Sequence, residues 1–255
     1  MGRNFVYSHT RLQARHGERP GEQDWRTVES QQDLPGFLQS ARQTALKNWV
    51  SGLQATDDHH LLEASLLARY RDYIEDLARW VPGNWRRSVE WTKSLSYLPA
   101  LQHLLRGNTP QDWMLRDPVL KQFATTHSDQ RSSLLLQSNF ADVVLAWQRG
   151  QSLPEGWATC WQALWPDMPS GQRAGLRSVV STVREHRSAF SDINAQSAWR
   201  RRDVLADRLR MMFRHYSYQP AAIFVHLLLV ALDVERLRGA LLQRALFPGY
   251  REVGA

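Results

Sequence analysis

The spacing of apolar residues is the feature that most constrains the fold of this 255-residue chain. Apolar side chains recur three and four positions apart almost throughout, which is the period of an amphipathic helix. Alternating runs of Val, Ile and Thr, which would indicate half-buried strands, are missing. The sequence therefore predicts an all-α protein made of many helices.

The clearest predicted helix covers residues 58–80, capped by Thr56 or Asp57 and ended by Pro82 and Gly83. Its apolar positions step by four, three, four and three, at Leu66, Tyr70, Tyr73, Leu77 and Trp80. Further helices are expected at residues 34–53 (opened by Asp33 and Pro35), 84–107 (interrupted at Pro99), 133–150, 192–215 and 220–246.

One stretch rich in Pro, Gly and Trp, residues 152–175, is the best candidate for a hinge. It would separate an N-terminal helical part, residues 1–151, from a C-terminal helical part, residues 176–255. One continuous domain is the alternative.

Cysteine and apolar content bear on the location of the chain. Cys160 is the only cysteine, so no internal disulfide can form, and a buried thiol is expected. The first residues carry charge without an apolar run, which indicates neither a secretory signal nor a membrane anchor. The most apolar stretch, residues 220–232, has thirteen residues against about 20 needed to cross a bilayer. A cytoplasmic location is expected.

The chain has 32 basic and 25 acidic residues, giving a net charge of +7, and 29 of the 32 basic residues are arginines. Arginine suits interfaces, phosphates and nucleic acid because its planar guanidinium makes paired, permanently charged contacts. Arginine-rich codon usage explains the same composition. Eleven tryptophans fit either a core or a binding surface.

A search for catalytic and cofactor motifs finds no phosphate loop, dinucleotide fingerprint, zinc-protease motif or nucleophile elbow. We therefore expect neither enzymatic activity nor a cofactor. One metal-like cluster, Asp57-Asp58-His59-His60 with Glu63, supplies two ligands on one helix face, and acidic residues at a helix start are explained better by the helix dipole. His226 is expected to be a hydrogen-bonded core histidine.

Two clusters could bind a partner. Trp157, Trp161 and Trp165 recur every fourth residue, so they form either part of a core or a binding ridge. The run Trp199-Arg200-Arg201-Arg202 makes a basic helix that could bind nucleic acid, although Asp203 and Asp207 interrupt it and a solvated or protein-facing surface is the favoured interpretation.

Three segments, at the start, middle and end of the chain, carry a family resemblance. The opening Tyr7-Ser8-His9-Thr10-Arg11-Leu12-Gln13-Ala14-Arg15 has a Tyr followed by Arg-Leu-x-Ala. Residues 97–107, YLPALQHLLRG, approach a phrase of the Asn-Leu-x-x-Leu-Leu-Arg type, with Pro99 and the missing Asn as departures. With residues 220–238, these segments resemble the AC39 family of V-type ATPase subunits, whose last helix has Glu in place of Asp233 and Asn in place of Arg236.

This resemblance implies a funnel-like bundle of helical repeats that seats on the membrane rotor ring and receives the central stalk. It implies a non-catalytic connector, peripheral at the cytoplasmic face of the membrane, whose partners are other protein subunits. An arginine-rich nucleic-acid-binding protein, or an adaptor of another complex, is the alternative. The residues expected to bind partners are Tyr7, Arg11, Arg15, Arg106, Trp157, Trp161, Arg200, Arg201, Arg202, Asp233, Arg236 and Arg238.

Overall fold

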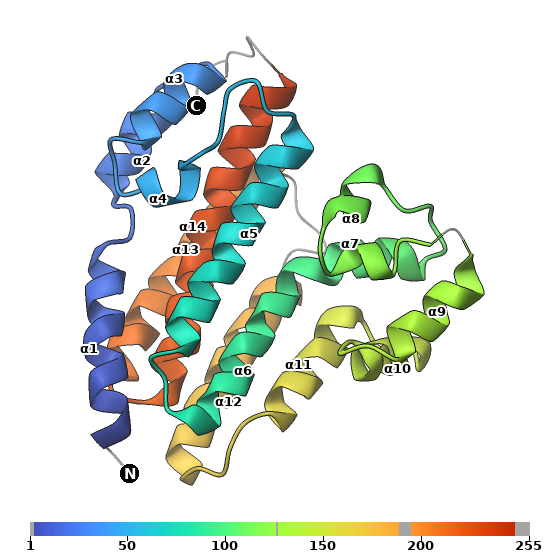
Figure 1. Ribbon diagram of the computed structural model, residues 1–255. Helices are drawn as coiled ribbons and strands as arrows, with labels where there is room; N and C mark the ends of the chain where they lie inside the picture. The colour runs from blue at the N-terminus through green and yellow to red at the C-terminus, as the bar shows by residue number, and fades with distance from the viewer. Residues whose placement is uncertain (1–2, 126, 189–194, 248–255) are drawn as a thin grey trace. The chain divides into compact units, whose positions relative to one another are not determined.

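The computed structural model describes residues 3–125, 127–188 and 195–247, and every regular element in these ranges is helical (Figure 1). The predicted all-α class is confirmed. The funnel and the repeats stay predictions. The chain divides into two compact units: residues 1–82 with 167–255 form unit 1, and residues 83–166 form unit 2. No helix within the described ranges is long and apolar enough to cross a membrane.

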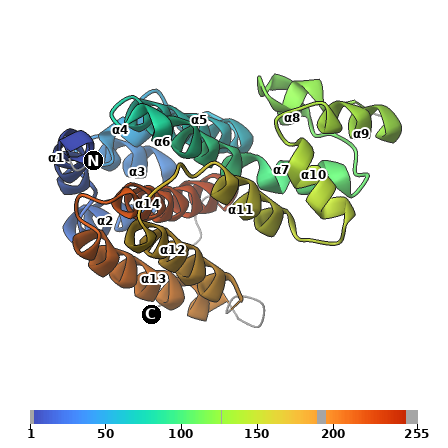
Figure 2. The same cartoon turned by 90° about the horizontal axis from the view of Figure 1, so that it is seen from below.

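Unit 1 is built around its last helix, α14 (Pro220–Leu246), against which helices from both ends of the chain pack. Figure 2 shows α12 and α13 on one side of α14 and α5 on the other. Residues 220–227 of α14 are all buried, which explains why every one of them except His226 is apolar. The other helices of unit 1 are α1 (Arg3–Gly17), α2 (Glu22–Glu29), α3 (Leu34–Ala41), α4 (Lys47–Val50), α5 (His59–Ala78), α12 (Ser170–Ser188) and α13 (Ala195–His215).

Unit 2 has a core of its own, in which the side chains of Trp157 and Trp161 stack with ring centroids 5.7 Å apart. Trp157 donates a hydrogen bond from Nε1 to Ser94 Oγ at 2.6 Å, and Trp161 donates one to the carbonyl of Ser88 at 3.1 Å. Its elements are α6 (Gly83–Glu90), the 3-10 helix η1 (Trp91–Tyr97), α7 (Leu98–Leu105), α8 (Asp112–Arg116), η2 (Leu120–Gln122), α9 (Ser128–Leu136), α10 (Ala141–Gln148) and α11 (Leu153–Ala163).

Helix starts follow local chemistry. The carboxylate of Asp33 accepts a hydrogen bond from the backbone N–H of Gly36 at 2.7 Å, so α3 begins where expected. The N-cap of α5 is Asp58, which accepts from the N–H of Leu61 at 2.8 Å; the expected caps, Thr56 and Asp57, were wrong by one or two residues. Helix α14 has the predicted bounds, and the expected residues 192–194 of the preceding helix lie outside the described residues.

Two of the predicted helices are each divided into two shorter ones. At each break a side-chain hydroxyl bonds to backbone groups that would otherwise continue the helix. Residues 34–53 form α3 and α4, and between them Thr44 donates to the carbonyl of Ala41 and accepts from the N–H of Leu46. Residues 133–150 fall into α9 and α10, separated at Ser138, which donates to the carbonyl of Leu135. Such local side-chain bonds compete with a continuing helix.

Pro99 was expected to interrupt a helix, and this prediction is wrong. It lies in the first turn of α7. A proline is tolerated there because the first-turn N–H groups have no partner within the helix. Residues 84–107 are therefore α6, η1 and α7 in succession. Cys160 was expected to be buried and is only half-buried, and that partial burial raises the pKa of its thiol.

The borders of the two units bear on the expected hinge. The chain returns from unit 2 to unit 1 at residues 166–167, inside the expected hinge of residues 152–175. It enters unit 2 at residues 82–83, which lie inside the expected N-terminal part, residues 1–151. The two ends of the chain share unit 1 because α14 buries its apolar side against helices α1 and α5. The three-part division itself stays a prediction.

Candidate partner-binding groove

The second half of α14 carries charged side chains that hold the N-terminal segments of unit 1. Asp233 and Arg19 form a paired ion bridge, with Nε–Oδ2 at 2.7 Å and Nη2–Oδ1 at 3.0 Å. Both side chains are nearly buried, 13% and 11% exposed. Burial raises the pKa of Asp233, and the Arg19 guanidinium opposes that rise. This bridge fastens the connection between α1 and α2 to α14.

One turn further, Arg236 binds Glu29 at the end of α2. Its Nε and Nη2 atoms each donate to one carboxylate oxygen at 2.7 Å, the planar geometry that makes such pairs strong. The guanidinium also lies over the ring of Trp25, 4.6 Å from the centroid. Arg236 therefore fixes α2 by charge and by stacking.

Arg238 points to α5, where Nε and Nη2 reach Glu63 Oε1 at 2.7 and 2.6 Å. Glu63 belonged to the metal-like cluster of the sequence, and here its carboxylate is engaged by a guanidinium. The rings of His59 and His60 lie against each other, with centroids 4.0 Å apart. Within the described ranges no group of three or more metal-binding side chains is assembled.

Near its end, α14 presents Arg244 to the turn after α2. Nη2 donates to the carbonyls of Gln31 at 2.7 Å and Glu29 at 3.1 Å, and the guanidinium lies 4.6 Å from the Phe37 ring centroid. Cations favourably occupy the carboxyl end of a helix, where carbonyls lack partners. Asp233, Arg236 and Arg244 thus form a row of contacts along one side of α14.

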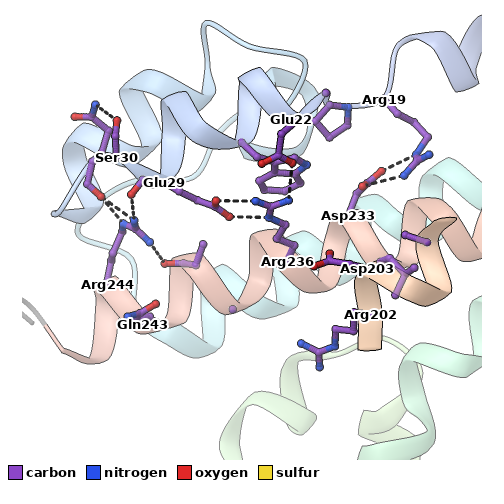
Figure 3. Close-up of a pocket in the computed structure, with 18 of the residues that line it drawn as sticks. Arg19, Glu22, Glu29, Ser30, Arg202, Asp203, Asp233, Arg236, Gln243 and Arg244 are labelled. Atoms are coloured by element: carbon purple, nitrogen blue, oxygen red, sulfur yellow. Dashed lines mark hydrogen bonds and ion pairs between the residues drawn. The ribbon is translucent and has the colours of Figure 1, made fainter. Parts of the chain in front are cut away.

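The contacts of Asp233, Arg236 and Arg244 border a groove of about 1110 Å³ within unit 1, formed by the segment from α1 to α2, by α13 and by the second half of α14 (Figure 3). We call it the charged groove. Among the described residues, five arginines and five carboxylates line it: Arg19, Arg202, Arg210, Arg236, Arg244, Glu22, Glu29, Asp203, Asp207 and Asp233. Such a lining suits a polar, charged partner surface.

A smaller cavity of about 280 Å³ is also lined by the bridge between Arg19 and Asp233. Both cavities are lined by that pair and by Pro20. The ion bridge therefore borders both cavities.

Two neighbouring histidines, half-buried His16 and buried His226, lie at and behind the wall of the charged groove. His226 is fully buried, as expected of a core histidine, and its Nε2 lies 2.6 Å from the hydroxyl of Tyr73. The ring of His16, which lines the groove, has its centroid 5.7 Å from that of His226. In the described part of the chain both Nδ1 atoms are buried and have no hydrogen-bond partner.

Burial holds these histidines in the neutral form. Desolvation lowers the pKa of His16 to about 4, and the charges of Arg19 and Arg210 add to the effect. The pKa of His226 is lowered well below its usual value by desolvation, then by His16 and Arg19. Neither ring is therefore charged near neutral pH.

The predicted residues of α1 lie outside the charged groove. Arg11 and Arg15 stack on Trp80, 4.4 and 5.4 Å from its ring centroid. Tyr7 is 58% exposed and its hydroxyl accepts a hydrogen bond from Arg11 at 2.7 Å. Arg15 lines only the smaller cavity.

The other predicted residues divide between core and surface. Trp157 and Trp161 are buried in unit 2, 7% and 5% exposed, which favours core packing over a binding ridge. Arg106 is exposed at the end of α7. On α13, Arg200 and Arg201 are exposed, and the side chain of Trp199 lies outside the described residues.

Of the twelve predicted residues, the charged groove brings together Arg202, Asp233 and Arg236. The prediction missed Arg19 and Arg244. No spacing signal could have found them, since their partners lie 214 and 213 residues away in the chain. Fold and groove together define an all-α protein with a groove lined by charged side chains. Comparison of the chain with protein-family models, curated proteins and solved structures found no match.

Proposed function

We propose that this chain is a non-catalytic connector subunit, resembling the central-stalk component that links the soluble stalk of V/A-type rotary ATPases to the membrane rotor ring. In this role it acts at the cytoplasmic face of the membrane and binds other protein subunits. The resemblance of residues 7–15 and 220–238 to the AC39 family is the starting point, and both segments belong to unit 1.

The observation that carries the proposal is the attachment of the last helix to the start of the chain. Asp233, Arg236 and Arg238 belong to the family-like phrase, and each binds a different N-terminal segment through a carboxylate–guanidinium pair. A connector that transmits torque must not separate under load. Three such pairs along one helix resist separation of the two ends of the chain.

The charged groove is the surface where a partner would dock. It offers guanidinium and carboxylate groups held in place by their own ion pairs, so little side-chain ordering is needed when a partner binds. Protein interfaces often have polar rims with charge complementarity of this kind.

The test places a bulky side chain in the groove while keeping all of its charged residues. Ala206 on α13 lines the groove, so Ala206→Trp would obstruct part of it. Ala64 is exposed on α5 and does not line it, which makes Ala64→Trp the matched control. Tagged wild-type and variant chains are expressed in the native host, recovered in mild detergent, and their partners identified by mass spectrometry.

Wild-type and Ala64→Trp chains should recover rotary ATPase subunits, and Ala206→Trp should lose most of them. Recovery of a different assembly by all three chains would reject the rotary role. Equal recovery by both variants would reject the groove as the docking surface.

A further inference from the structure

Two consecutive helices carry the whole positive excess of the chain. Helices α12 and α13 contain ten arginines and three acidic residues. The full chain has 32 basic and 25 acidic residues, so 22 of each remain elsewhere and balance. Codon usage would spread arginine evenly, and this concentration therefore calls for a structural explanation.

The fold turns this charge outward. Leu176 of α12 and Leu209 and Phe213 of α13 are buried, and both helices pack on α14. Figure 2 shows the two helices side by side in one layer of unit 1. We call the exposed arginines of this layer the arginine face; they include Arg177, Arg184, Arg187, Arg200, Arg208 and Arg214.

The layer has three acids, Glu185, Asp203 and Asp207, against ten arginines, so seven positive charges remain. Glu185 pairs with Arg208 at 2.7 Å, and Asp207 pairs with Arg210 at 2.6 Å. Burial lowers the pKa of His186 on α12, and the charges of Arg202 and Arg201 lower it further, as a positive local potential requires.

Two large apolar side chains stand exposed on the same side of α13. Val204 is 68% and Met211 is 58% exposed. They lie seven positions apart, about two helical turns, so they share one face with Arg200, Arg208 and Arg214. Asp207 lies between them on this face, where its carboxylate is paired with Arg210. Exposed apolar groups among mainly cationic side chains are typical of helices that lie on a membrane surface.

We propose that the arginine face docks on anionic phospholipid headgroups, with Val204 and Met211 entering the interfacial layer. Each arginine that approaches an anionic bilayer raises affinity roughly fivefold. At 19 and 21 residues the two helices are about 30 Å long, enough to cover several headgroups.

Nucleic acid explains these features less well. Proteins that follow a nucleic-acid strand combine a basic groove with aromatic side chains on which bases stack. The arginine face is the outward side of a helix pair, and the large apolar groups described on it are aliphatic. This inference does not rest on the connector role, because the face differs from the charged groove.

The test measures binding of the full chain to vesicles at about 0.15 M salt. One vesicle is pure phosphatidylcholine, and the other contains about one third phosphatidylglycerol as the anionic lipid. The chain should sediment with the anionic vesicle only. A triple variant, Arg177→Gln, Arg184→Gln and Arg214→Gln, should bind about a hundredfold more weakly.

A matched control removes the same charge elsewhere. Arg86, Arg87 and Arg149 are exposed in unit 2, and their replacement by Gln also lowers the net charge by three. This control should bind as the wild type does. Circular dichroism confirms that both triple variants are folded. Equal weakening of both would show that net charge, not the arginine face, binds the vesicle, and would overturn the proposal.

A fluorescent label tests the depth of insertion. Cys160 is the single cysteine, so Val204→Cys in a Cys160→Ser background takes one environment-sensitive dye. Its emission should shift to the blue on anionic vesicles, while the same dye at Ala64→Cys on α5 should not shift. Absence of vesicle binding, or binding to a DNA duplex or single strand at the same salt without vesicle binding, would overturn the proposal.

Discussion

Asp233 and Arg19 form the ion pair whose loss should cost most. Asp233→Ala leaves a nearly buried guanidinium without its carboxylate, which should lower the free energy of unfolding by about 3 kcal/mol. Urea unfolding followed by circular dichroism measures this. The control is Asp76→Ala, whose ion pair with Arg79 is 53% and 67% exposed and should contribute below about 1 kcal/mol. Similar small losses for both variants would contradict a structural role for the buried pair.

Histidine burial makes unit 1 sensitive to acid. The pKa of His16 is about 4 in the folded chain and 6.5 when unperturbed, so between these values the unfolded chain binds more protons. The contribution of neutral His16 to the free energy of unfolding is therefore complete above pH 6.5. It is lost as the pH falls from 6.5 through about 4. With the part-exposed ring allowed for, the loss is about 2 kcal/mol.

The variant His16→Phe isolates this effect. A phenyl ring can keep the stacking on Phe213, whose centroid lies 4.1 Å from that of His16, while removing the proton site. Unfolding free energies measured from pH 7 to pH 4 should therefore fall less steeply for His16→Phe than for the wild type. Parallel pH curves would show that His16 is not the group responsible.

At the residue scale, the sequence indicates which charged side chains of α14 matter but not which residues they bind. Asp233, Arg236 and Arg238 could be singled out because they share one phrase on one helix. Glu29 and Glu63 lie 207 and 175 residues from the arginines that they bind, so no local spacing predicts the pairs. Tertiary packing alone decides them.

Helix contacts give a prediction at the scale of elements. In α11, a Cβ added at Gly156 would lie 2.8 Å from the Cβ of Ala146 on α10, too close for two methyl groups. Gly156→Ala gains up to about 1 kcal/mol of helix propensity but forces α10 and α11 apart, which costs about 1–3 kcal/mol. The net effect should be a lower melting temperature.

Gly171 on α12 supplies the comparison, because no atom lies within 4 Å of an added Cβ there. Gly171→Ala should leave the melting temperature unchanged or raise it slightly. If Gly156→Ala raised it as well, the close approach of α10 and α11 would be wrong.

A helix end could be predicted only where nearby residues in the sequence mark it. Helix α14 could be predicted in full because Pro220, a long apolar run and the following Pro248 mark it in sequence. The breaks at Thr44 and Ser138 could not, since a hydroxyl bends the chain only where tertiary packing favours its local hydrogen bonds. Tyr218 likewise turns the chain before α14 with φ +62°, a conformation that its side chain does not signal.

For the whole molecule, the division into two units leads to a prediction about folding. Unit 2 is a continuous segment, residues 83–166, and a chain of about 80 residues can form one small core. The buried guanidinium of Arg131 donates to the carbonyls of Leu104, Asn108 and Thr125, all within this unit. The isolated segment should therefore be helical and unfold cooperatively.

Unit 1 joins the two ends of the chain, so its N-terminal segment should not fold cooperatively when isolated. A fragment of residues 1–82 lacks α14, so the apolar faces of α1 and α5 would have no helix to cover them. Circular dichroism and thermal unfolding of both fragments test the contrast. In the isolated unit 2, Arg131→Met should abolish the cooperative transition, because several buried carbonyls lose their donor. A non-cooperative wild-type segment, or cooperative folding of residues 1–82 alone, would show that the two units are not the folding units of this protein.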